Sequence, residues 1–262
     1  MRALRTVVCL ALGLAGCAGY PEGSLLDGVR PGADCRINVM AVFAHPDDES
    51  FYTGGTLIKL GKDPRVRLHV LCLTNGNMDE AKDNLGITRE MLGRMRVKEL
   101  ESAAMVLGAS TAACMGYDDQ GLAGADGAEL SARVEDAVRK AGADVIITHD
   151  PYGLSGHEDH IVCSRVATAA FSETDAQRLY YVTMSPARYR FNLLFALSDS
   201  PAEKSVPTVR VNIRAEKTMK RLALYAHVTQ HHFSFWNALA MREDLLFDYE
   251  HFALAGARDG VK

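Results

Sequence analysis

The segment INVMAVFAHPDDE, from Ile37 to Glu49, joins a short apolar run to a dense polar cluster. Its first half, Ile37–Phe43, is apolar and partly β-branched, which predicts a buried strand. Pro46 then restricts the backbone of the turn that follows. Because an imidazole and three carboxylates come directly after the run, we expect a strand whose C-terminal end carries chemically active side chains.

From Ile37 onward, short apolar runs alternate with longer segments of helical periodicity, the pattern of a parallel sheet covered by helices. The expected strands are Ile37–Phe43, Arg67–Leu73, Ala112–Met115, Asp144–Thr148 and Arg178–Met184, with one more in Pro201–Ile213. The expected helices are Thr53–Lys62, Thr88–Leu107, Glu129–Ala141, Asp159–Phe171 and Ala215–His227, the last with Lys217, Lys220 and Arg221 on a solvated face. The predicted fold class is α/β, a Rossmann-like, mostly parallel sheet flanked by helices, in a single domain over residues 37–262.

Composition is consistent with one folded domain. A chain of 262 residues with 48% hydrophobic residues can bury a full core. The formal net charge is −4 and no long run of Lys and Arg occurs, which argues against a nucleic-acid partner.

The N-terminus, MRALRTVVCLALGLAGCAGY, has the organisation of a secretion signal. Two arginines precede an apolar run, Val7–Leu14, that is too short to cross a bilayer as a helix. The sequence LAGC ending at Cys17 resembles the bacterial lipobox, in which the cysteine is acylated and becomes the mature N-terminus. We therefore expect a lipoprotein signal over residues 1–17, a short tether over 18–36, and anchoring to the extracytoplasmic side of a bacterial membrane in the cell envelope. The alternative is an ordinary cleaved signal with a coincidental cysteine.

Export would permit disulfides, and four cysteines lie outside the signal: Cys35, Cys72, Cys114 and Cys163. None forms a CxxC pair. Cys72 and Cys114 lie in apolar strand-like runs, which favours buried free thiols, and a disulfide stays open as the alternative.

Polar residues gather after four of the expected strands. They are His45-Pro-Asp-Asp-Glu49 after the first, Thr74-Asn-Gly-Asn77 after the second, Asp118-Asp119 after the third, and His149-Asp150 leading into Gly156-His-Glu-Asp-His160 after the fourth. Ligands of open α/β sheets bind at the carboxyl ends of the strands, so we expect these clusters to converge on one pocket.

The charge concentrated at His45–Glu49 is costly unless a cation compensates it. Catalytic zinc sites use three protein ligands, chiefly His and carboxylates, and leave one position open. His45 and one aspartate could supply two ligands. His157 and His160, at i and i+3 at the start of a helix, can face a common centre and are the best source of a third. For an isolated HxxH pair a surface or capping role is as good an explanation, but two clusters at strand ends of one sheet favour a metal.

In these motifs the sequence resembles the family of GlcNAc-phosphatidylinositol de-N-acetylases (PIG-L) and related LmbE-like amino-sugar deacetylases. The resemblance covers roughly Asn38 to Leu254. The matching stretches are AHPDDE at Ala44–Glu49, LCLTNGN at Leu71–Asn77, RVKELESAAMVLG at Arg96–Gly108, YDDQGLAG at Tyr117–Gly124, THDPYGLSGHEDH at Thr148–His160 and AHVTQ at Ala226–Gln230. The first and fifth are highly specific in this order and separation.

The resemblance implies roles for particular residues. The implied zinc ligands are His45, Asp48 and His160. Asp47 would be the general base that activates the attacking water, and His157 the second catalytic residue, which stabilises the oxyanion and protonates the departing amine. Asp159 would orient a histidine from the side away from the metal.

Arg96 and Asp119 align with family positions that contact the sugar. The alternatives are a helix-surface salt bridge for Arg96 and a turn-forming role for Asp119. Asn77 and Gln230 lie in resembling stretches too, and loop capping explains them equally well.

One position departs from some relatives, which carry a tyrosine two residues before the first histidine of HxxH, where this chain has Ser155. Oxyanion stabilisation would then depend more on zinc and His157, or on Tyr152 of the same loop.

The predicted function is a zinc-dependent N-deacetylase, a hydrolase of linear amides that removes acetyl from an N-acetylglucosamine-containing glycan, glycolipid or conjugate. Another divalent metal in vivo stays open, as do the aglycone and the oligomeric state. The alternatives are a metal-dependent amidase that removes a different acyl group, and a non-catalytic sugar-binding envelope lipoprotein. The presence of Asp47, Asp48, His157 and His160 together argues against the binding protein, which needs no base. The expected partners are the amino-sugar substrate and a membrane, through lipid on Cys17.

Overall fold

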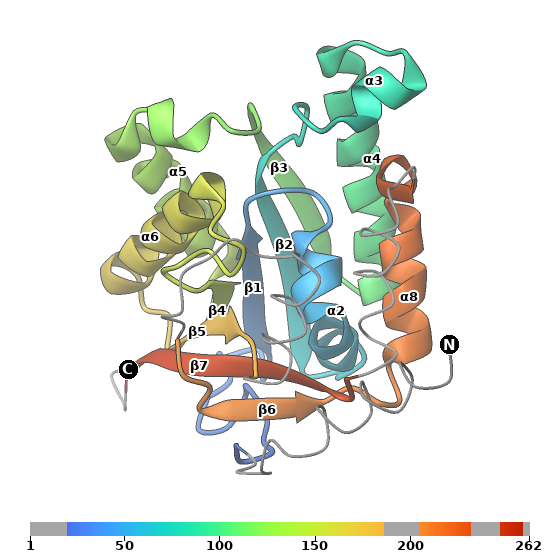
Figure 1. Ribbon diagram of the computed structural model, residues 1–262. Helices are drawn as coiled ribbons and strands as arrows, with labels where there is room; N and C mark the ends of the chain where they lie inside the picture. The colour runs from blue at the N-terminus through green and yellow to red at the C-terminus, as the bar shows by residue number, and fades with distance from the viewer. Residues whose placement is uncertain (1–19, 186–204, 232–246, 259–262) are drawn as a thin grey trace, which may run out of the picture.

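The computed structural model describes residues 20–185, 205–231 and 247–258, which form a sheet with helices on both faces (Figure 1). The strands are β1 (Ile37–Phe43), β2 (Val66–Thr74), β3 (Thr111–Tyr117), β4 (Val145–His149), β5 (Arg178–Thr183), β6 (Val209–Asn212) and β7 (Tyr249–Ala257). The helices are α2 (Asp48–Gly61), α3 (Ala81–Leu85), α4 (Arg89–Leu107), α5 (Gly127–Ala141), α6 (Glu158–Glu173) and α8 (Lys217–Ala226), with 3₁₀ turns η1 (Leu122–Gly124) and η2 (Val228–His231).

The sheet order is β3-β2-β1-β4-β5-β7-β6. Strands β1 to β5 are parallel, and β7 pairs antiparallel with both β5 and β6. This confirms the prediction of a Rossmann-like, mostly parallel sheet in an α/β fold. The chain moves outward from β1 to β3 and then returns to β4, so the order reverses between β1 and β4. In open sheets this reversal leaves a crevice at the carboxyl ends of the two strands.

Strand β1 is buried on both faces, as its continuous apolar sequence predicts. Alternate residues, among them Val39 and Phe43, pack into the core under α2, while Met40 and Val42 pack into the core under α5 and α6. The strand is therefore rigidly held just before the polar turn that begins at Ala44.

Helix α2 begins at Asp48, five residues before the expected start at Thr53. The acidic motif thus forms the first turn of the helix, where the positive end of the helix dipole favours the carboxylates of Asp48 and Glu49. Sequence periodicity missed this turn because its polar residues are buried.

The prediction that Lys220 lies on a solvated face is wrong. Helix α8 packs against α2 and α4, and Lys220 is fully buried with its Nζ 2.8 Å from Oε1 of Glu250. The carboxylate of Glu250 also accepts from the backbone N–H groups of Gly55 and Thr56 in α2. The lysine is inside because β7, a strand absent from the predicted elements, places a carboxylate in the core beneath it.

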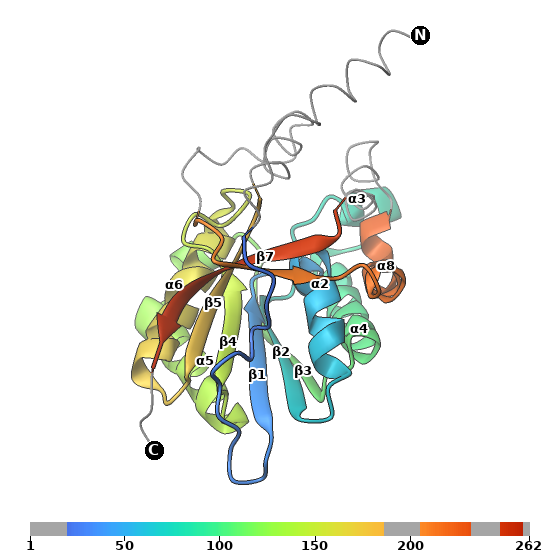
Figure 2. The same cartoon turned by 90° about the horizontal axis from the view of Figure 1, so that it is seen from below.

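Residues 20–36, within the expected tether, pack against the domain. Leu25 is 1% exposed and belongs to the core that contains Ile37. Arg210 of β6 exchanges backbone hydrogen bonds with Pro21 and Gly23, and Figure 2 shows the segment running along the sheet beside β1. The predicted signal and lipobox lie outside the described residues.

No helix in the described ranges is long and apolar enough to cross a membrane. All four cysteines outside the signal, Cys35, Cys72, Cys114 and Cys163, are free in the structure. Of the two expected to be buried, Cys72 is buried and Cys114 is half-buried, and Cys163 is buried as well.

Candidate active site

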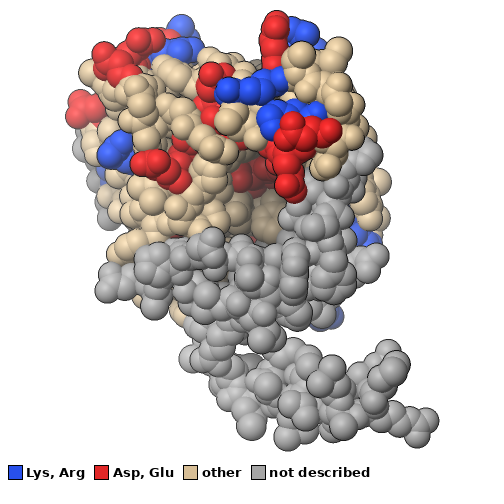
Figure 3. Space-filling model, turned by 45° about the horizontal axis from the view of Figure 1, so that its top comes forward, with Lys and Arg blue, Asp and Glu red and all other residues tan. Residues whose placement is uncertain are grey.

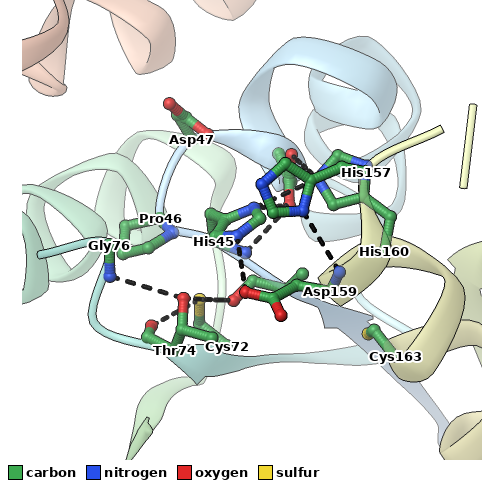
Figure 4. A network of polar contacts seen from close by, with 12 residues as sticks. His45, Pro46, Asp47, Cys72, Thr74, Gly76, His157, Asp159, His160 and Cys163 are labelled. Carbon is green, nitrogen blue, oxygen red and sulfur yellow. Dashed lines mark hydrogen bonds and ion pairs between the residues drawn. The ribbon is translucent and has the colours of Figure 1, made fainter. Parts of the chain in front are cut away.

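The site lies at the carboxyl ends of β1 and β4, where the strand order reverses. His45 comes from the turn after β1 and His160 from the first turn of α6 (Figure 4). Asp48 comes from the first turn of α2. All three are buried. His45 Nδ1 lies 3.0 Å from His160 Nε2 and 3.4 Å from Asp48 Oδ2, and His160 Nε2 lies 3.4 Å from Asp48 Oδ1.

These distances fit a single bound cation. Ligand atoms at ~2.0–2.2 Å from a tetrahedral zinc ion stand about 3.3–3.6 Å from one another. Here the two histidine nitrogens are 3.0 Å apart, and each lies 3.4 Å from a different oxygen of the Asp48 carboxylate. Within the described residues, groups with ligand atoms close enough to share one ion include His45 with His157 and His160, and Asp48 with His149 and His160. Two imidazoles and one carboxylate are also a usual ligand set of catalytic zinc, so the donors here are suitable for zinc or a similar divalent ion.

The orientation of His160 suits a metal ligand. Its Nδ1 lies 3.0 Å from the carbonyl oxygen of Gly153, which can only accept, so Nδ1 carries the proton and Nε2 has a free lone pair. Burial, together with the neighbouring histidines, holds the pKa of His160 well below its usual range despite Asp48. Ser155 Oγ lies 3.4 Å from the same Nδ1, so the serine contacts the back of this imidazole.

His149 has no predicted role, yet it is fully buried in the same cluster. Its Nε2 lies 3.2 Å from Asp48 Oδ2, and its ring stacks on that of His160 at 4.0 Å. The imidazole therefore lies against the carboxylate of Asp48 from the side of β4, and its Nε2 accepts from the backbone N–H of Ala44 at 3.3 Å. Its position at the last residue of a parallel strand is the sequence signal that could have indicated this contact.

Two carboxylates face the other nitrogen of His45. Its Nε2 lies 3.1 Å from Asp119 Oδ1 and 3.3 Å from Asp159 Oδ2. Burial alone would lower the pKa of His45, but Asp119, Asp159 and Asp48 outweigh it and raise that pKa well above its usual value. Asp159 was expected to orient a histidine, and Asp119 was expected to contact the sugar. Both thus lie against His45, a predicted metal ligand.

Asp159 also organises the loop after β3, because its carboxylate accepts from the backbone N–H groups of Gln120 and Leu122. Asn77 holds the same loop by accepting from the N–H of Asp119 and donating to Asp118. Loop capping therefore accounts for the contacts of Asn77.

Asp47 differs from its neighbour Asp48 in both backbone and contacts. Its φ of 122° is unusual for a non-glycine residue, and such strain costs about 1–3 kcal/mol. Its Oδ2 accepts from the guanidinium of Arg96 at 2.9 Å. Burial, with the nearby charge of Asp48, raises the pKa of Asp47 to about 7, although Arg96 opposes the rise. A carboxyl group with such a pKa suits a general base at neutral pH.

Arg96 is buried at 3% exposure, so the alternative of a helix-surface salt bridge is wrong. Its guanidinium donates to the carbonyl oxygens of Gly76 and Pro46 as well as to Asp47. Gly76 has φ +65°, and a Cβ there would collide with the guanidinium, which explains the glycine. The structure thus places Arg96 behind the turn that carries Asp47.

His157 both caps α6 and faces the predicted metal ligands. Its Nδ1 accepts from the backbone N–H of Asp159 at 3.1 Å, which leaves Nε2 as the protonated nitrogen of the neutral ring. The ring lies edge-on to His45 with centroids 4.6 Å apart. Burial, with the positive charge of His45, lowers the pKa of His157. In this state Nε2–H can donate a hydrogen bond to an oxyanion while Nδ1 caps the helix. Transfer of a proton from His157 requires Nδ1 to be protonated as well, which ends its contact with the N–H of Asp159.

The face at the carboxyl ends of the strands is hollowed, and Lys, Arg, Asp and Glu side chains gather along the upper side of the hollow (Figure 3). The fold and the site together define an α/β protein with a histidine and carboxylate cluster, suited to a metal, at the carboxyl edge of its sheet.

Comparison with known proteins identifies the family. The sequence model of PIG-L, described as GlcNAc-PI de-N-acetylase, matches residues 40–171, which include the whole cluster. The chain belongs to this family of PIG-L and LmbE-like deacetylases, which confirms the resemblance seen in its motifs.

Among its relatives is a 1D-myo-inositol 2-acetamido-2-deoxy-alpha-D-glucopyranoside deacetylase of Saccharomonospora viridis, 32% identical, with 73% of this chain and 84% of the relative covered. Another, from Bacillus anthracis, is named "Probable N-acetyl-alpha-D-glucosaminyl L-malate deacetylase 2" and is 31% identical over 74% of this chain and 81% of its own length. A solved structure of N,N'-diacetylchitobiose deacetylase from Pyrococcus horikoshii matches with a TM-score of 0.63 over 97% of this chain and 91% of its own. At 20% identity this last likeness shows the fold.

Proposed function

We propose that the protein is a zinc-dependent N-deacetylase that hydrolyses the acetamido group of an N-acetylglucosamine-containing substrate. The observation that carries the proposal is the convergence of His45, Asp48 and His160 within 3.4 Å of one another, beside a second aspartate with different contacts. A ligand set and a separate base are the two parts that metal-assisted amide hydrolysis requires.

The substrate class follows from what the relatives' names share. One relative is named for an acetamido-glucopyranoside of inositol, and the other for an N-acetylglucosaminyl malate. Both names contain an N-acetylated glucosamine unit, whereas the group attached to it differs. We therefore propose an N-acetyl-glucosaminide as substrate.

The residues have the following roles in the proposed reaction. A zinc ion held by His45, Asp48 and His160 would polarise the acetamido carbonyl and lower the pKa of a water molecule to about 7. Asp47 accepts the proton of the attacking water, and Arg96 keeps its carboxylate oriented. His157, once protonated on both nitrogens and released from the N–H of Asp159, would give the proton on Nε2 to the departing nitrogen and return to the neutral ring, so that water and the amide become acetate and a free amine. Asp119 and Asp159 hold the ring of His45 in place.

We also propose that the protein is anchored to the extracytoplasmic side of a bacterial membrane through lipid on Cys17. The support is the sequence of the N-terminus alone, in which a charged start, an apolar run and LAGC follow one another. An N-acetylated sugar of the envelope would then be within reach of the site.

The experiment is release of acid from a panel of N-acetylated sugars that share glucosamine and differ in aglycone. The purified protein should release acetate and a primary amine from at least one of them, should lose this activity on treatment with a chelator, and should recover it with zinc. Release of a longer acid in preference to acetate would support the amidase alternative instead. Binding of a panel sugar without release of any acid, in the zinc-loaded protein, would support the non-catalytic binding protein.

A further inference from the structure

The strained backbone of Asp47 is held by a carboxylate from its own motif. The N–H of Asp47 donates to Oε2 of Glu49 at 3.0 Å, while the Asp47 side chain is held separately by Arg96. No side-chain capping hydrogen bond accompanies Asp47 at the start of α2. The direction of the Asp47 carboxylate therefore depends on Glu49 as well as on Arg96.

Glu49 is itself held by a residue far along the chain. Its side chain is fully buried, and Oε1 lies 2.8 Å from Nε2 of His227 and 2.6 Å from Oγ of Ser50. Burial disfavours charge on both partners, yet their attraction lowers the pKa of Glu49 and raises that of His227. The contact is thus a buried, charge-assisted hydrogen bond between two elements, α2 and the end of α8.

Packing alone does not explain a histidine at position 227. The residue is 1% exposed, and its Nδ1 has no hydrogen-bond partner among the residues that the structure describes. A buried nitrogen without a partner is costly, so an apolar side chain of similar size would serve packing better. What the imidazole supplies is the contact with Glu49.

The turn that carries His227 is tied to the helix that carries Arg96. Just after His227, Thr229 donates its N–H and its hydroxyl to the two oxygens of Glu99, at 2.8 and 2.7 Å. Glu99 lies three residues after Arg96 in α4. The two supports of Asp47, one on its side chain and one on its backbone, are therefore linked through α4 and η2.

We propose that Glu49 and His227 form a positioning pair that fixes the backbone of Asp47 and so aims the base at its water. The inference rests on the proposed function, since it assigns the pair to the base of that reaction. Both residues act through Asp47, because Glu49 accepts from the backbone N–H of Asp47 and His227 holds Glu49.

The test compares His227→Phe with His227→Gln. Phenylalanine keeps the volume but cannot donate, whereas the amide nitrogen of glutamine can take the place of Nε2. His227→Phe should lower kcat about 10- to 100-fold with KM and zinc content unchanged, as for other outer contacts of active-site groups. His227→Gln should retain most of the wild-type kcat. If phenylalanine is tolerated better than glutamine, the histidine serves packing and the proposal is overturned.

Two controls separate positioning from general damage. His251→Phe changes another buried histidine, in β7, whose ring lies edge-on to Tyr20, and it should leave kcat unchanged. In an Asp47→Asn background, His227→Phe should cause no further loss of kcat, because the pair acts only through Asp47. An additional loss equal to that in the wild type would refute the inference.

Amide hydrogen exchange at Asp47, followed by NMR on the zinc-loaded protein, tests the same contact without activity. The wild-type amide should be protected, and protection should fall in His227→Phe and persist in His227→Gln. Should the wild type release no acid from any substrate, the proposed function fails while this exchange still decides whether the pair holds Asp47. If His227→Phe does not fold, His227→Leu, a smaller apolar side chain that also cannot donate to Glu49, replaces it in both measurements, and unchanged kcat and protection in that variant would overturn the proposal.

Discussion

The adjacent aspartates allow the proposed base, Asp47, to be separated from the proposed metal ligand, Asp48, with one matched pair of substitutions. Asp47→Asn and Asp48→Asn each exchange a carboxylate for an amide of nearly the same shape. The structure gives the two positions different surroundings. Asp48 lies within 3.4 Å of nitrogens of both His45 and His160, whereas Asp47 is held by Arg96.

Asp47→Asn should keep its zinc and lose activity. General-base catalysis contributes ~10²–10⁴-fold, which corresponds to about 3–5 kcal/mol of transition-state stabilisation. The amide cannot accept a proton, and asparagine tolerates a positive φ at least as well as aspartate, so the backbone at 122° should persist. Asp48→Asn should instead lower zinc occupancy, because a neutral amide oxygen is a weaker ligand than a carboxylate.

The dependence of activity on pH gives a second signature. Burial raises the pKa of Asp47 to about 7 in the metal-free protein, and a nearby cation would lower that pKa. A base acts only when deprotonated, so wild-type kcat/KM should rise with pH along a limb whose midpoint lies at or below about 7. Asp47→Asn should lose this limb. His157→Ala should lose or displace the alkaline limb, since an acid acts only when protonated.

The assay is metal analysis of each purified variant together with its pH profile of kcat/KM on the best sugar of the panel. A zinc-bound water can contribute to either limb, so zinc content must be measured on the same preparations. The reasoning is refuted if Asp47→Asn turns over near the wild-type rate, or if it loses zinc while Asp48→Asn retains it.

Three further results are expected. Lys220→Met should lower the free energy of unfolding by about 3–5 kcal/mol in urea denaturation, because it removes the cation that pairs with Glu250 in the core. A double variant with Glu250→Gln should recover part of the loss. An unchanged midpoint for Lys220→Met would contradict the buried pair. Gly61→Ala should lower Tm, because its Cβ would collide with the carbonyl oxygen of Leu107; a Tm equal to that of the wild type would show that the helices can separate there. Cys17→Ser should abolish incorporation of labelled fatty acid, and an unlabelled wild-type protein in the soluble fraction would refute the anchor.

The central strands and most of the helices could be predicted from the chain alone. Strand β1 runs over Ile37–Phe43 as expected, and α4 begins at Arg89, one residue after the expected start at Thr88, and ends at the predicted Leu107. These elements have strong local signals, either a continuous apolar run or a capping residue followed by helical spacing. By contrast, β7 was missed because its sequence places Glu250 and His251 inside the protein, and a local pattern assigns such residues to the surface.

The site was predictable to the extent that its residues follow parallel strands. Motifs after β1 and β4 predicted that His45 and His160 would meet, and their nitrogens lie 3.0 Å apart. The strand order supplies the reason, since β1 and β4 are neighbours and the carboxyl ends of parallel neighbours share one edge. The roles of these residues in metal binding and catalysis stay predictions until the variants are measured.

Contacts between distant elements came only from the folded chain. His227 reaches Glu49 across 178 residues, and Lys220 reaches Glu250 because α8 packs over α2 and β7. Nothing in the spacing of these residues distinguishes a buried partner from a solvated one. A strand or helix follows from the interactions of near neighbours in sequence, whereas the partner of a buried charge depends on which elements pack together.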